Sequence, residues 1–245
     1  MKKPLVVVFV PCADGKQSPD LREEPFSPLL CYSRIFLLVQ YSDTLDDRIQ
    51  LWKKSAHKAM PSVSQIRAAV AVADALDYLH SKNVIFRDLK PANVGFDNLG
   101  VLKLFDFGFA VTGQPIYHDL AGTRRYMAPE VGLNLGYHLP ADIYSFGILL
   151  WEICALKKPF GDVKSAEEFE ERVFKGGARP KLGKAWPTGL TKIMSECWDN
   201  DPEARPEMRC VKTNLTALTK DMANKTIEGR GGGLRSSMMR RISIG

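Results

Sequence analysis

The spacing of apolar and polar positions predicts two strands near the start of the chain and an amphipathic helix behind them. Residues 6–10 and 35–41 are short apolar runs rich in β-branched or bulky side chains, which is typical of strands. Residues 62–81 repeat apolar positions at helical spacing, and Ser62 or Ser64 can cap the start of this helix. One face of the helix gathers Ile66, Ala69, Val70, Ala73, Leu76 and Leu79.

The rest of the chain adds a β-hairpin and a series of helices. Apolar runs at 94–96 and 101–105 flank the turn-forming sequence Asp-Asn-Leu-Gly at 97–100, which predicts a hairpin. Helical spacing returns at residues 45–54, 141–156, 165–175, 188–198 and 207–222. A little β structure followed by mostly α structure predicts an α+β fold with a helical main domain.

Composition places the chain among folded globular proteins. It has 245 residues, of which 45% are hydrophobic and 25% charged, enough for one large domain or two small ones. No apolar run approaches the ~18–20 residues that span a bilayer, so no transmembrane segment is expected. The five cysteines are scattered and form no Cys-x-x-Cys pair, which disfavours a zinc site and a disulfide scaffold. We therefore expect an intracellular, cytoplasmic protein.

The net charge of +6 is unevenly distributed along the chain. Residues 226–245 carry four arginines and one glutamate, and their Gly, Ser and Arg content predicts a disordered basic tail. The body of the chain shows no basic stripe, so no nucleic-acid partner is expected.

The predicted hairpin brings chemically useful side chains to one of its ends. With a four-residue turn, Asn93 would lie opposite Leu104, and Asp106 would follow two residues further on, one diagonal step away. Asp88 and Lys90 lie on the loop before the hairpin. Two carboxylates, an amide and an amine would thus converge, and hard oxygen ligands of this kind suit Mg²⁺ together with phosphate oxygens.

Five sequence motifs follow one another in a characteristic order. They are DLKPAN at 88–93, DFG at 106–108, APE at 128–130, DIYSFG at 142–147, and CW at 197–198 with DPEARP at 201–206. Each alone would be weak, but together they resemble the catalytic half of a eukaryotic protein kinase of the tyrosine-kinase-like Ser/Thr type. The resemblance covers roughly residues 35–222.

The resemblance implies a role for each residue of the predicted cluster in a phosphoryl transfer that uses ATP and Mg²⁺. Asp88 would orient the substrate hydroxyl and accept its proton. Lys90 would neutralise charge that develops on the γ-phosphate, and a lysine at this spacing is similar to Ser/Thr rather than Tyr kinases. Asn93 and Asp106 would hold Mg²⁺, so that Lys90, Asn93 and Asp106 together would contact the nucleotide.

The resemblance also divides the chain into parts. Residues 38–41 resemble the hinge, in which backbone groups of Val39, Gln40 and Tyr41 would hydrogen-bond adenine. The implied domains are a remnant of the small lobe with the hinge at 1–41, the large lobe at 42–225, and the disordered basic tail at 226–245. The implied fold is a mainly helical large lobe with an incomplete β-rich small lobe.

Five other positions match the family or depart from it. Glu130 and Arg205 match a buried ion pair, and Asp142 matches a residue that holds the catalytic-loop backbone. Phe86 stands where the family usually has histidine, and we expect it mainly to pack. Gly95 stands where a larger apolar residue usually supports adenine, which leaves a gap that a neighbouring side chain could fill.

Hydroxyl groups in two regions are candidates for modification by an upstream kinase. Thr112, Tyr117 and Thr123 lie between the DFG and APE motifs, and a phosphate on one of them would pair with Arg87. Thr123 better fits a role in shaping the substrate groove. Ser243 follows two arginines and resembles a site for a basic-directed kinase, although a solvated tail is the simpler interpretation.

Residues 1–41 lack features that the family has before its hinge. They contain no Gly-x-Gly-x-x-Gly loop and no lysine in a Val-Ala-x-Lys-like strand, and prolines around Glu23 and Glu24 exclude a useful helix there. Because the nucleotide clamp needs that lysine and a helical glutamate, we expect this polypeptide alone to transfer phosphate poorly. Three functions stay open: a Ser/Thr kinase acting on a protein substrate, a pseudokinase serving as a binding or scaffolding module, and an unrelated small-molecule phosphotransferase.

Overall fold

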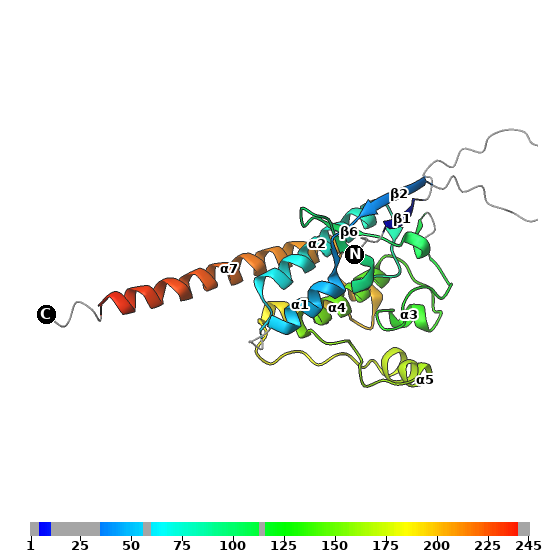
Figure 1. Cartoon of the computed structure of the whole chain (residues 1–245). Coiled ribbons are helices and arrows are strands. Elements are labelled where there is room, and N and C mark those ends of the chain that lie inside the picture. The colour runs from blue at the N-terminus through cyan, green and yellow to red at the C-terminus, as the bar shows by residue number, and fades with distance from the viewer. Residues whose placement is uncertain (1–4, 11–34, 56–59, 113–115, 240–245) are drawn as a thin grey trace, which may run out of the picture.

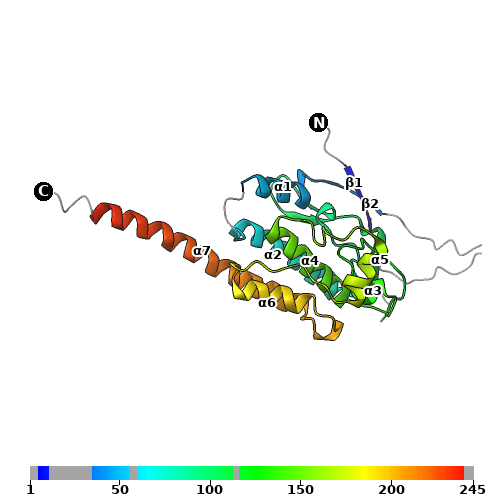
Figure 2. The ribbon, with the colours of Figure 1, turned by 90° about the horizontal axis from the view of Figure 1, so that it is seen from below.

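Helix α4 (Pro140–Ala155) forms the centre of the protein. The fold is seen in a computed structural model that describes residues 5–10, 35–55, 60–112 and 116–239, with side chains described between residues 41 and 226 of that set. Nearly every residue of α4 is buried, as expected of a helix that is apolar on all sides. It contacts both α2 (Val63–Ser81) and α6 (Thr188–Cys197) within the helical body (Figure 2). The helix predicted at 141–156 is confirmed.

The start of α2 is determined by a capping box. The Ser62 backbone N–H donates to Gln65 Oε1 at 2.6 Å, and the Gln65 N–H donates in return to Ser62 Oγ at 3.3 Å. These two bonds satisfy backbone donors that a helix end leaves without partners. Ser62 rather than Ser64 is therefore the capping residue, and the helix predicted at 62–81 is confirmed.

Helix α7 (Met208–Met239) lies along α2 with its first turns and then extends away from the body (Figure 1). Val211 and Leu215, in the first turns of α7, are buried in the core. The helix continues to Met239, beyond the predicted end at residue 222 and into the segment predicted to be disordered. Once the packed first turns have nucleated a helix, each added residue contributes one more backbone hydrogen bond, so continuation is easier than initiation. Residues 240–245, including Ser243, lie outside the described part.

Shorter helices surround this centre. Their bounds are α1 Leu45–Ser55, α3 Pro129–Gly132, α5 Ala166–Phe169, the 3₁₀ turns η1 Pro91–Asn93, η2 Phe107–Phe109 and η4 Pro202–Ala204, and the π-helical segment η3 Glu170–Lys175, which continues α5. The predicted helices at 45–54, 165–175 and 188–198 are thus present. Residues 176–187, between η3 and α6, form neither helix nor strand.

The strands form three small sheets. β1 (Leu5–Val10) pairs antiparallel with β2 (Ile35–Gln40), and β4 (Val84–Ile85) pairs antiparallel with β7 (Val111–Thr112). The third sheet has β5 (Val94–Phe96) between β3 (Asp43–Thr44) and β6 (Leu102–Leu104). These few strands beside a helical body confirm the predicted α+β class. Within the described residues, no helix is both long enough and apolar enough to cross a membrane.

The turn of the β5–β6 hairpin is shorter than predicted. The Asp97 backbone N–H donates to the carbonyl oxygen of Val101 at 3.0 Å, so only residues 98–100 form the loop. The Asp97 carboxylate accepts the N–H groups of Leu99 and Val101, both at 2.9 Å. Gly100 then adopts a left-handed φ of 78°, which is typical of a three-residue hairpin loop.

This one-residue difference changes which residues face each other. Leu104 lies opposite Val94 instead of Asn93, and the Phe105 N–H donates to the Asn93 carbonyl oxygen at 3.1 Å. The predicted pairing of Asn93 with Leu104 was therefore wrong. Asp106 is only one residue beyond the partner of Asn93, which brings it nearer than the prediction did.

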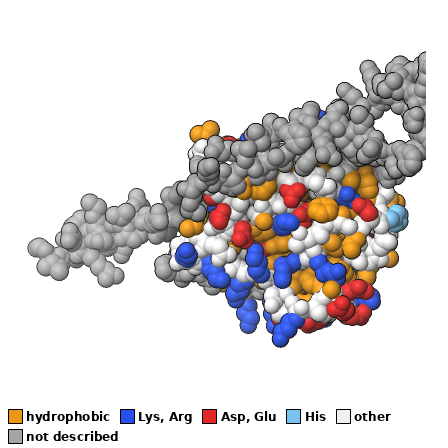
Figure 3. All heavy atoms as spheres, turned by 45° about the vertical axis from the view of Figure 1, so that its right-hand side comes forward, with side chains coloured by type: hydrophobic (Ala, Val, Ile, Leu, Met, Phe, Trp, Pro, Cys, Tyr) orange, Lys and Arg blue, Asp and Glu red, His pale blue; other side chains and the backbone are white. Residues whose placement is uncertain are grey.

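The surface seen in Figure 3 mixes hydrophobic side chains with acidic and basic ones. Among the described residues, the exposed large apolar side chains include Phe109, Ile116 and Leu120. All three belong to the segment between the DFG and APE motifs, which therefore presents apolar groups outside the core.

Candidate active site

Helix α4 holds the loop that carries Asp88. Asp142, in the first turn of α4, accepts the backbone N–H groups of Phe86 at 2.7 Å and of Arg87 at 2.8 Å. Asp142 is fully buried and also bonds to His80 Nε2 at 3.1 Å. Arg87 has a φ of 68°, a left-handed conformation that costs a non-glycine residue about 1–2 kcal/mol and is maintained by these bonds. The prediction that Asp142 holds the backbone of this loop is confirmed.

Asp88 is the centre of a hydrogen-bonded cluster. Its Oδ2 accepts from Lys90 Nζ at 2.6 Å and from Asn93 Nδ2 at 2.9 Å. Its Oδ1 accepts from Thr123 Oγ1 at 2.7 Å, and Lys90 Nζ also donates to that hydroxyl at 3.0 Å. The Asp88 side chain is 1% exposed, so these bonds form largely away from water. The structure thus brings Asp88, Lys90 and Asn93 together and adds Thr123.

Gly122 allows Thr123 to approach the catalytic loop. A Cβ on Gly122 would lie 2.2 Å from the carbonyl oxygen of Arg87, and the φ of Gly122 is 97°, which disfavours any side chain. The sequence suggested that Thr123 shapes a substrate groove and did not predict its bond to Asp88. The glycine that precedes Thr123 was the one sequence feature that could have indicated a close contact with the loop of Asp88.

Asp106 is placed beside the cluster by the backbone. It follows Phe105, whose N–H is bonded to the Asn93 carbonyl oxygen, and its side chain is exposed. Asp106 has φ 63° and ψ 65°, so the left-handed turn falls on the aspartate itself. Gly108 instead leaves space, because a Cβ there would lie 3.3 Å from Asp106 Oδ1.

The side-chain oxygen atoms of Asn93 and Asp106 are the groups of this site that could hold Mg²⁺. The Asn93 amide nitrogen donates to the Asp88 backbone oxygen and carboxylate, so its carbonyl oxygen is the atom available to a cation. No group of three or more His, Cys, Asp or Glu side chains that could hold a metal occurs in the described part of the chain. An amide oxygen and a carboxylate are ligands that Mg²⁺ accepts, because this ion keeps several waters and binds phosphate oxygens besides a few protein ligands.

Phe86 has a packing role, as predicted. It is fully buried, and its ring meets that of Phe107 edge to face, with centroids 5.1 Å apart. The aromatic ring therefore supports the DFG segment without any proton-transfer group.

The predicted hinge lies at the end of β2. Val39 and Gln40 pair with Val6 and Leu5 of β1, and Tyr41 follows the strand. Only the backbone of Val39 and Gln40 is described, which is the part that the hinge hypothesis requires.

Aromatic rings fill the space that Gly95 leaves. The rings of Tyr41 and Phe105 stack at 5.0 Å with an angle of 8° between their planes. A Cβ on Gly95 would lie 2.8 Å from Phe105 Cε1 and 3.2 Å from Tyr41 Cβ. The sequence pointed to a gap but not to the residue that fills it. Phe105 is a diagonal cross-strand neighbour of Gly95, and only the correct register identifies it.

The ion pair predicted between Glu130 and Arg205 is confirmed. Arg205 Nη1 and Nη2 donate to the two carboxylate oxygens of Glu130 at 2.6 and 2.9 Å. The Arg205 side chain is 0% exposed and that of Glu130 is 7% exposed. The pair joins the start of α3 to the η4 turn and so supports the segment that carries Thr123.

Comparison with known proteins agrees with this geometry. The family profile described as protein kinase domain matches residues 30–215, which contain the Asp88 cluster, Asp106, Glu130 and Arg205. The serine/threonine-protein kinase STY17 of Arabidopsis thaliana is 34% identical over 171 residues, which are 69% of this chain and 30% of that protein. The dual specificity protein kinase shkC of Dictyostelium discoideum is 33% identical over 178 residues, which are 70% of this chain and 35% of that protein.

A third relative is the mitogen-activated protein kinase kinase kinase 7 of Drosophila melanogaster, 34% identical over 180 residues, which are 70% of this chain and 26% of that protein. The chain therefore spans about a third or less of the length of these relatives. The profile nevertheless covers most of the chain, and its range includes the cluster that the structure assembles. The chain belongs to the protein kinase family.

Proposed function

We propose that this chain is a protein serine/threonine kinase, which transfers the γ-phosphate of ATP to a hydroxyl group of a protein substrate. The contact set of Asp88 carries the proposal: a buried carboxylate with Lys90 Nζ at 2.6 Å and Asn93 Nδ2 at 2.9 Å. Phosphoryl transfer depends on positioning and charge neutralisation more than on covalent chemistry. These side chains are suited to both tasks.

The hydrogen bonds of Asp88 leave capacity for a substrate. A carboxylate has about four lone-pair sites. Lys90, Asn93 and Thr123 each donate one hydrogen bond to the Asp88 side chain. The remaining site would accept the substrate hydroxyl, orient it and take up its proton. The Lys90 ammonium group would meanwhile neutralise charge on the γ-phosphate.

Mg²⁺ and ATP are the proposed ligands of the same cluster. The Asn93 carbonyl oxygen and the Asp106 carboxylate would hold Mg²⁺, which bridges phosphate oxygens and reduces their charge. Backbone groups of Val39, Gln40 and Tyr41 would contact adenine. Lys90 would then reach the terminal phosphate from the side of Asp88.

We further propose that transfer by this polypeptide alone is slow. The sequence of residues 1–41 contains no glycine-rich loop and no lysine of the family type, and half of the nucleotide clamp is missing without them. A binding or scaffolding function as a pseudokinase is the second candidate. The stacked Tyr41 and Phe105 rings over Gly95 favour it, because they occupy space next to the proposed adenine site.

A transfer assay tests the proposal. The purified chain is incubated with labelled ATP, Mg²⁺ and a generic protein substrate, alongside the Asp88→Asn variant. We expect slow incorporation into Ser and Thr that Asp88→Asn abolishes and that Asp162→Asn, a change in an exposed carboxylate paired with Arg172, leaves intact.

The outcomes separate the two candidates. Incorporation that survives Asp88→Asn contradicts the assignment of Asp88. Absence of incorporation together with a thermal shift on adding Mg²⁺ and ATP supports the pseudokinase instead. Rapid, family-like turnover would contradict the proposed impairment.

Location and modification belong to the same proposal. An intracellular, cytoplasmic setting suits the described cysteines, Cys154, Cys197 and Cys210, which are all free. Modification by an upstream kinase at Ser243 stays a prediction, because that residue lies outside the described part.

A further inference from the structure

Arg87 connects the catalytic loop to the segment between the DFG and APE motifs. Its Nη1 donates to both carboxylate oxygens of Asp119, at 2.8 and 2.7 Å, and to the Tyr137 hydroxyl at 2.7 Å. Its Nε donates to the carbonyl oxygen of Phe109. The Arg87 side chain is only 8% exposed, whereas Asp119 is 57% exposed. A nearly buried cation is therefore neutralised by a carboxylate that comes from the protein surface.

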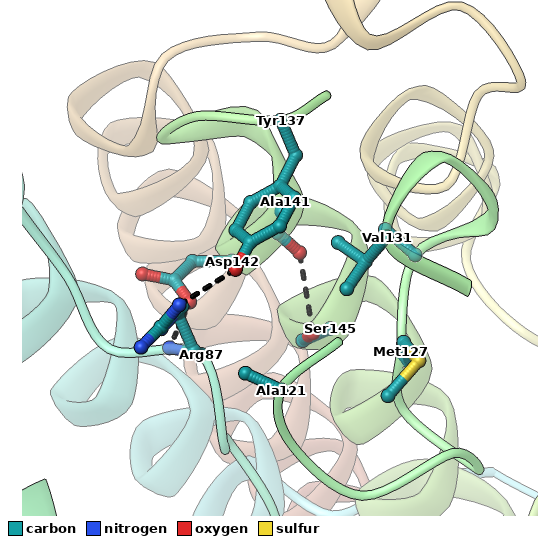
Figure 4. A pocket seen from close by; sticks show the side chains of 9 residues that line it. Arg87, Ala121, Met127, Val131, Tyr137, Ala141, Asp142 and Ser145 are labelled. Atoms are coloured by element: carbon teal, nitrogen blue, oxygen red, sulfur yellow. Dashed lines mark hydrogen bonds between the residues drawn. The ribbon is translucent and has the colours of Figure 1, made fainter. Parts of the chain in front are cut away.

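Tyr137, which lies just before α4, is the third member of the contact between Arg87 and Asp119. Its hydroxyl accepts from Arg87 and donates to Asp119 Oδ1 at 2.9 Å. Its backbone exchanges two hydrogen bonds of 2.9 Å with Tyr117, so the residues just before Asp119 are tied to the chain that leads into α4. Figure 4 shows Arg87 reaching the Tyr137 hydroxyl from the catalytic loop.

The space behind Arg87 is small. The cavity that Arg87, Asp142 and Tyr137 line together with small apolar side chains measures about 10 Å³, room for one water at most (Figure 4). Arg87 is therefore fixed from both ends, by Asp142 through its backbone and by Asp119 through its side chain. A shift of Asp119 would act directly on the residue next to Asp88.

We propose that Asp119 is a positioning residue, whose carboxylate seats the segment 116–123 on Arg87 so that Thr123 reaches Asp88 without any added phosphate. This inference rests on the proposed kinase function for its activity readout. It also revises the expectation that an upstream kinase supplies the partner of Arg87.

Charge at the site supports this assignment. Partial burial alone would raise the pKa of Asp119, but hydrogen bonds from Tyr137 and Arg87 lower it, so the carboxylate is ionised at neutral pH. The two nearest arginines in sequence are used elsewhere, since Arg124 donates to the Ala166 carbonyl oxygen and Arg125 to that of Pro159. One cation thus faces one anion, and a phosphate added beside Asp119 would bring unbalanced negative charge.

The candidate hydroxyls already have other contacts. Thr112 Oγ1 donates to the Asn83 carbonyl oxygen at 2.9 Å, and Thr123 Oγ1 is bonded to Asp88. The Tyr117 ring lies against that of Tyr137 at 6.0 Å. A phosphate on Thr112 or Thr123 would therefore have to displace a hydrogen bond that the hydroxyl now makes.

Hydrogen exchange and kinetics on phosphatase-treated protein test the proposal. The chain is treated with phosphatase, shown by mass spectrometry to carry no phosphate, and compared with Asp119→Asn, Asp119→Glu and the control Asp162→Asn. We expect Asp119→Asn to speed exchange of the 116–123 amides about tenfold and to lower kcat similarly with little change in KM for ATP, because charge-assisted bonds are lost. Asp119→Glu should restore both, and Asp162→Asn should match the unmodified chain.

The exchange data decide the inference even without activity. If no form transfers phosphate, the proposed function fails while the exchange comparison still tests Asp119. All forms in this comparison are free of phosphate. If the 116–123 amides of the chain without a substitution exchange as fast as those of Asp119→Asn, the proposal is overturned.

Discussion

Removing one partner of the buried Glu130–Arg205 pair should destabilise the protein far more than removing one partner of an exposed pair. Glu130→Gln keeps the shape of the side chain but leaves the Arg205 guanidinium, which is 0% exposed, without its counter-charge. Breaking a buried pair from one side costs about 3–5 kcal/mol. Because Arg205 also donates to the carbonyl oxygens of Pro140 and Asp199, both at 3.0 Å, we expect the lower end, about 3 kcal/mol.

Urea unfolding followed by tryptophan fluorescence measures this effect. The matched control is Glu168→Gln, which weakens a 2.7 Å pair with Arg172 whose side chains are 37% and 44% exposed. Exposed pairs contribute about 0.2–1 kcal/mol and are screened by salt. The double variant Glu130→Leu with Arg205→Met should recover most of the loss, since apolar replacement of both partners is often near neutral.

The comparison has a clear refuting result. If Glu130→Gln lowers the unfolding free energy no more than Glu168→Gln does, the buried pair does not stabilise this fold as argued. High salt should remove the effect of Glu168→Gln and leave that of Glu130→Gln, because a buried pair is little screened.

Single contacts elsewhere lead to three smaller effects. Gly122→Ala should destabilise the fold by about 2–3 kcal/mol and slow phosphoryl transfer, because the new Cβ would lie 2.2 Å from the carbonyl oxygen of Arg87. Gly100 is also left-handed but lies in open space, so Gly100→Ala should cost only about 1 kcal/mol in the same urea titration. Ser62→Ala should cost about 1 kcal/mol through loss of the cap, and Ser64→Ala less than about 0.5 kcal/mol. Burial raises the pKa of Glu152 despite its tyrosine and lysine partners, so the folded state keeps a proton to higher pH than the unfolded chain. The free energy of unfolding should therefore fall as pH rises through that pKa. Glu152→Gln should remove this contribution to the pH dependence of stability.

Each of these effects has a contrary result. Equal losses for the two glycine variants would mean that the close approach is relieved by movement of the loop. Equal losses for the two serine variants would contradict the assigned cap. An unchanged pH slope in Glu152→Gln would assign the titration to another group.

Elements with a strong local signal were predictable from the sequence. The helices expected at 62–81 and 141–156 begin at Val63 and Pro140, because apolar periodicity, a capping serine and an N-terminal proline act within one turn. The convergence of Asp88, Lys90 and Asn93 was also predictable, since they lie within six residues of one another and close on themselves through hydrogen bonds.

The register of the β5–β6 hairpin depended on hydrogen bonds of the Asp97 side chain, which residue propensities do not predict. Four turn-forming residues between two apolar runs allow loops of different length, and the Asp97 side chain selects the three-residue loop by accepting two backbone N–H groups. The shift by one residue moves Phe105 opposite Asn93 and its ring over Gly95. Composition and spacing alone could not choose between the two registers.

Six helices, the order of the motifs and the cluster of Asp88, Lys90 and Asn93 could be predicted from the sequence, although the last helix extends further than predicted. The bonds of Thr123 to Asp88 and of Asp119 to Arg87 join residues 35 and 32 positions apart, and they became known from the structure alone. Periodicity and capping are governed by neighbours within a turn or two, whereas these distant contacts depend on how α3 and α4 pack and on the close approach that Gly122 permits. The helices are therefore determined by neighbouring residues in the sequence, whereas the contacts of Thr123 and Asp119 at the site depend on tertiary packing.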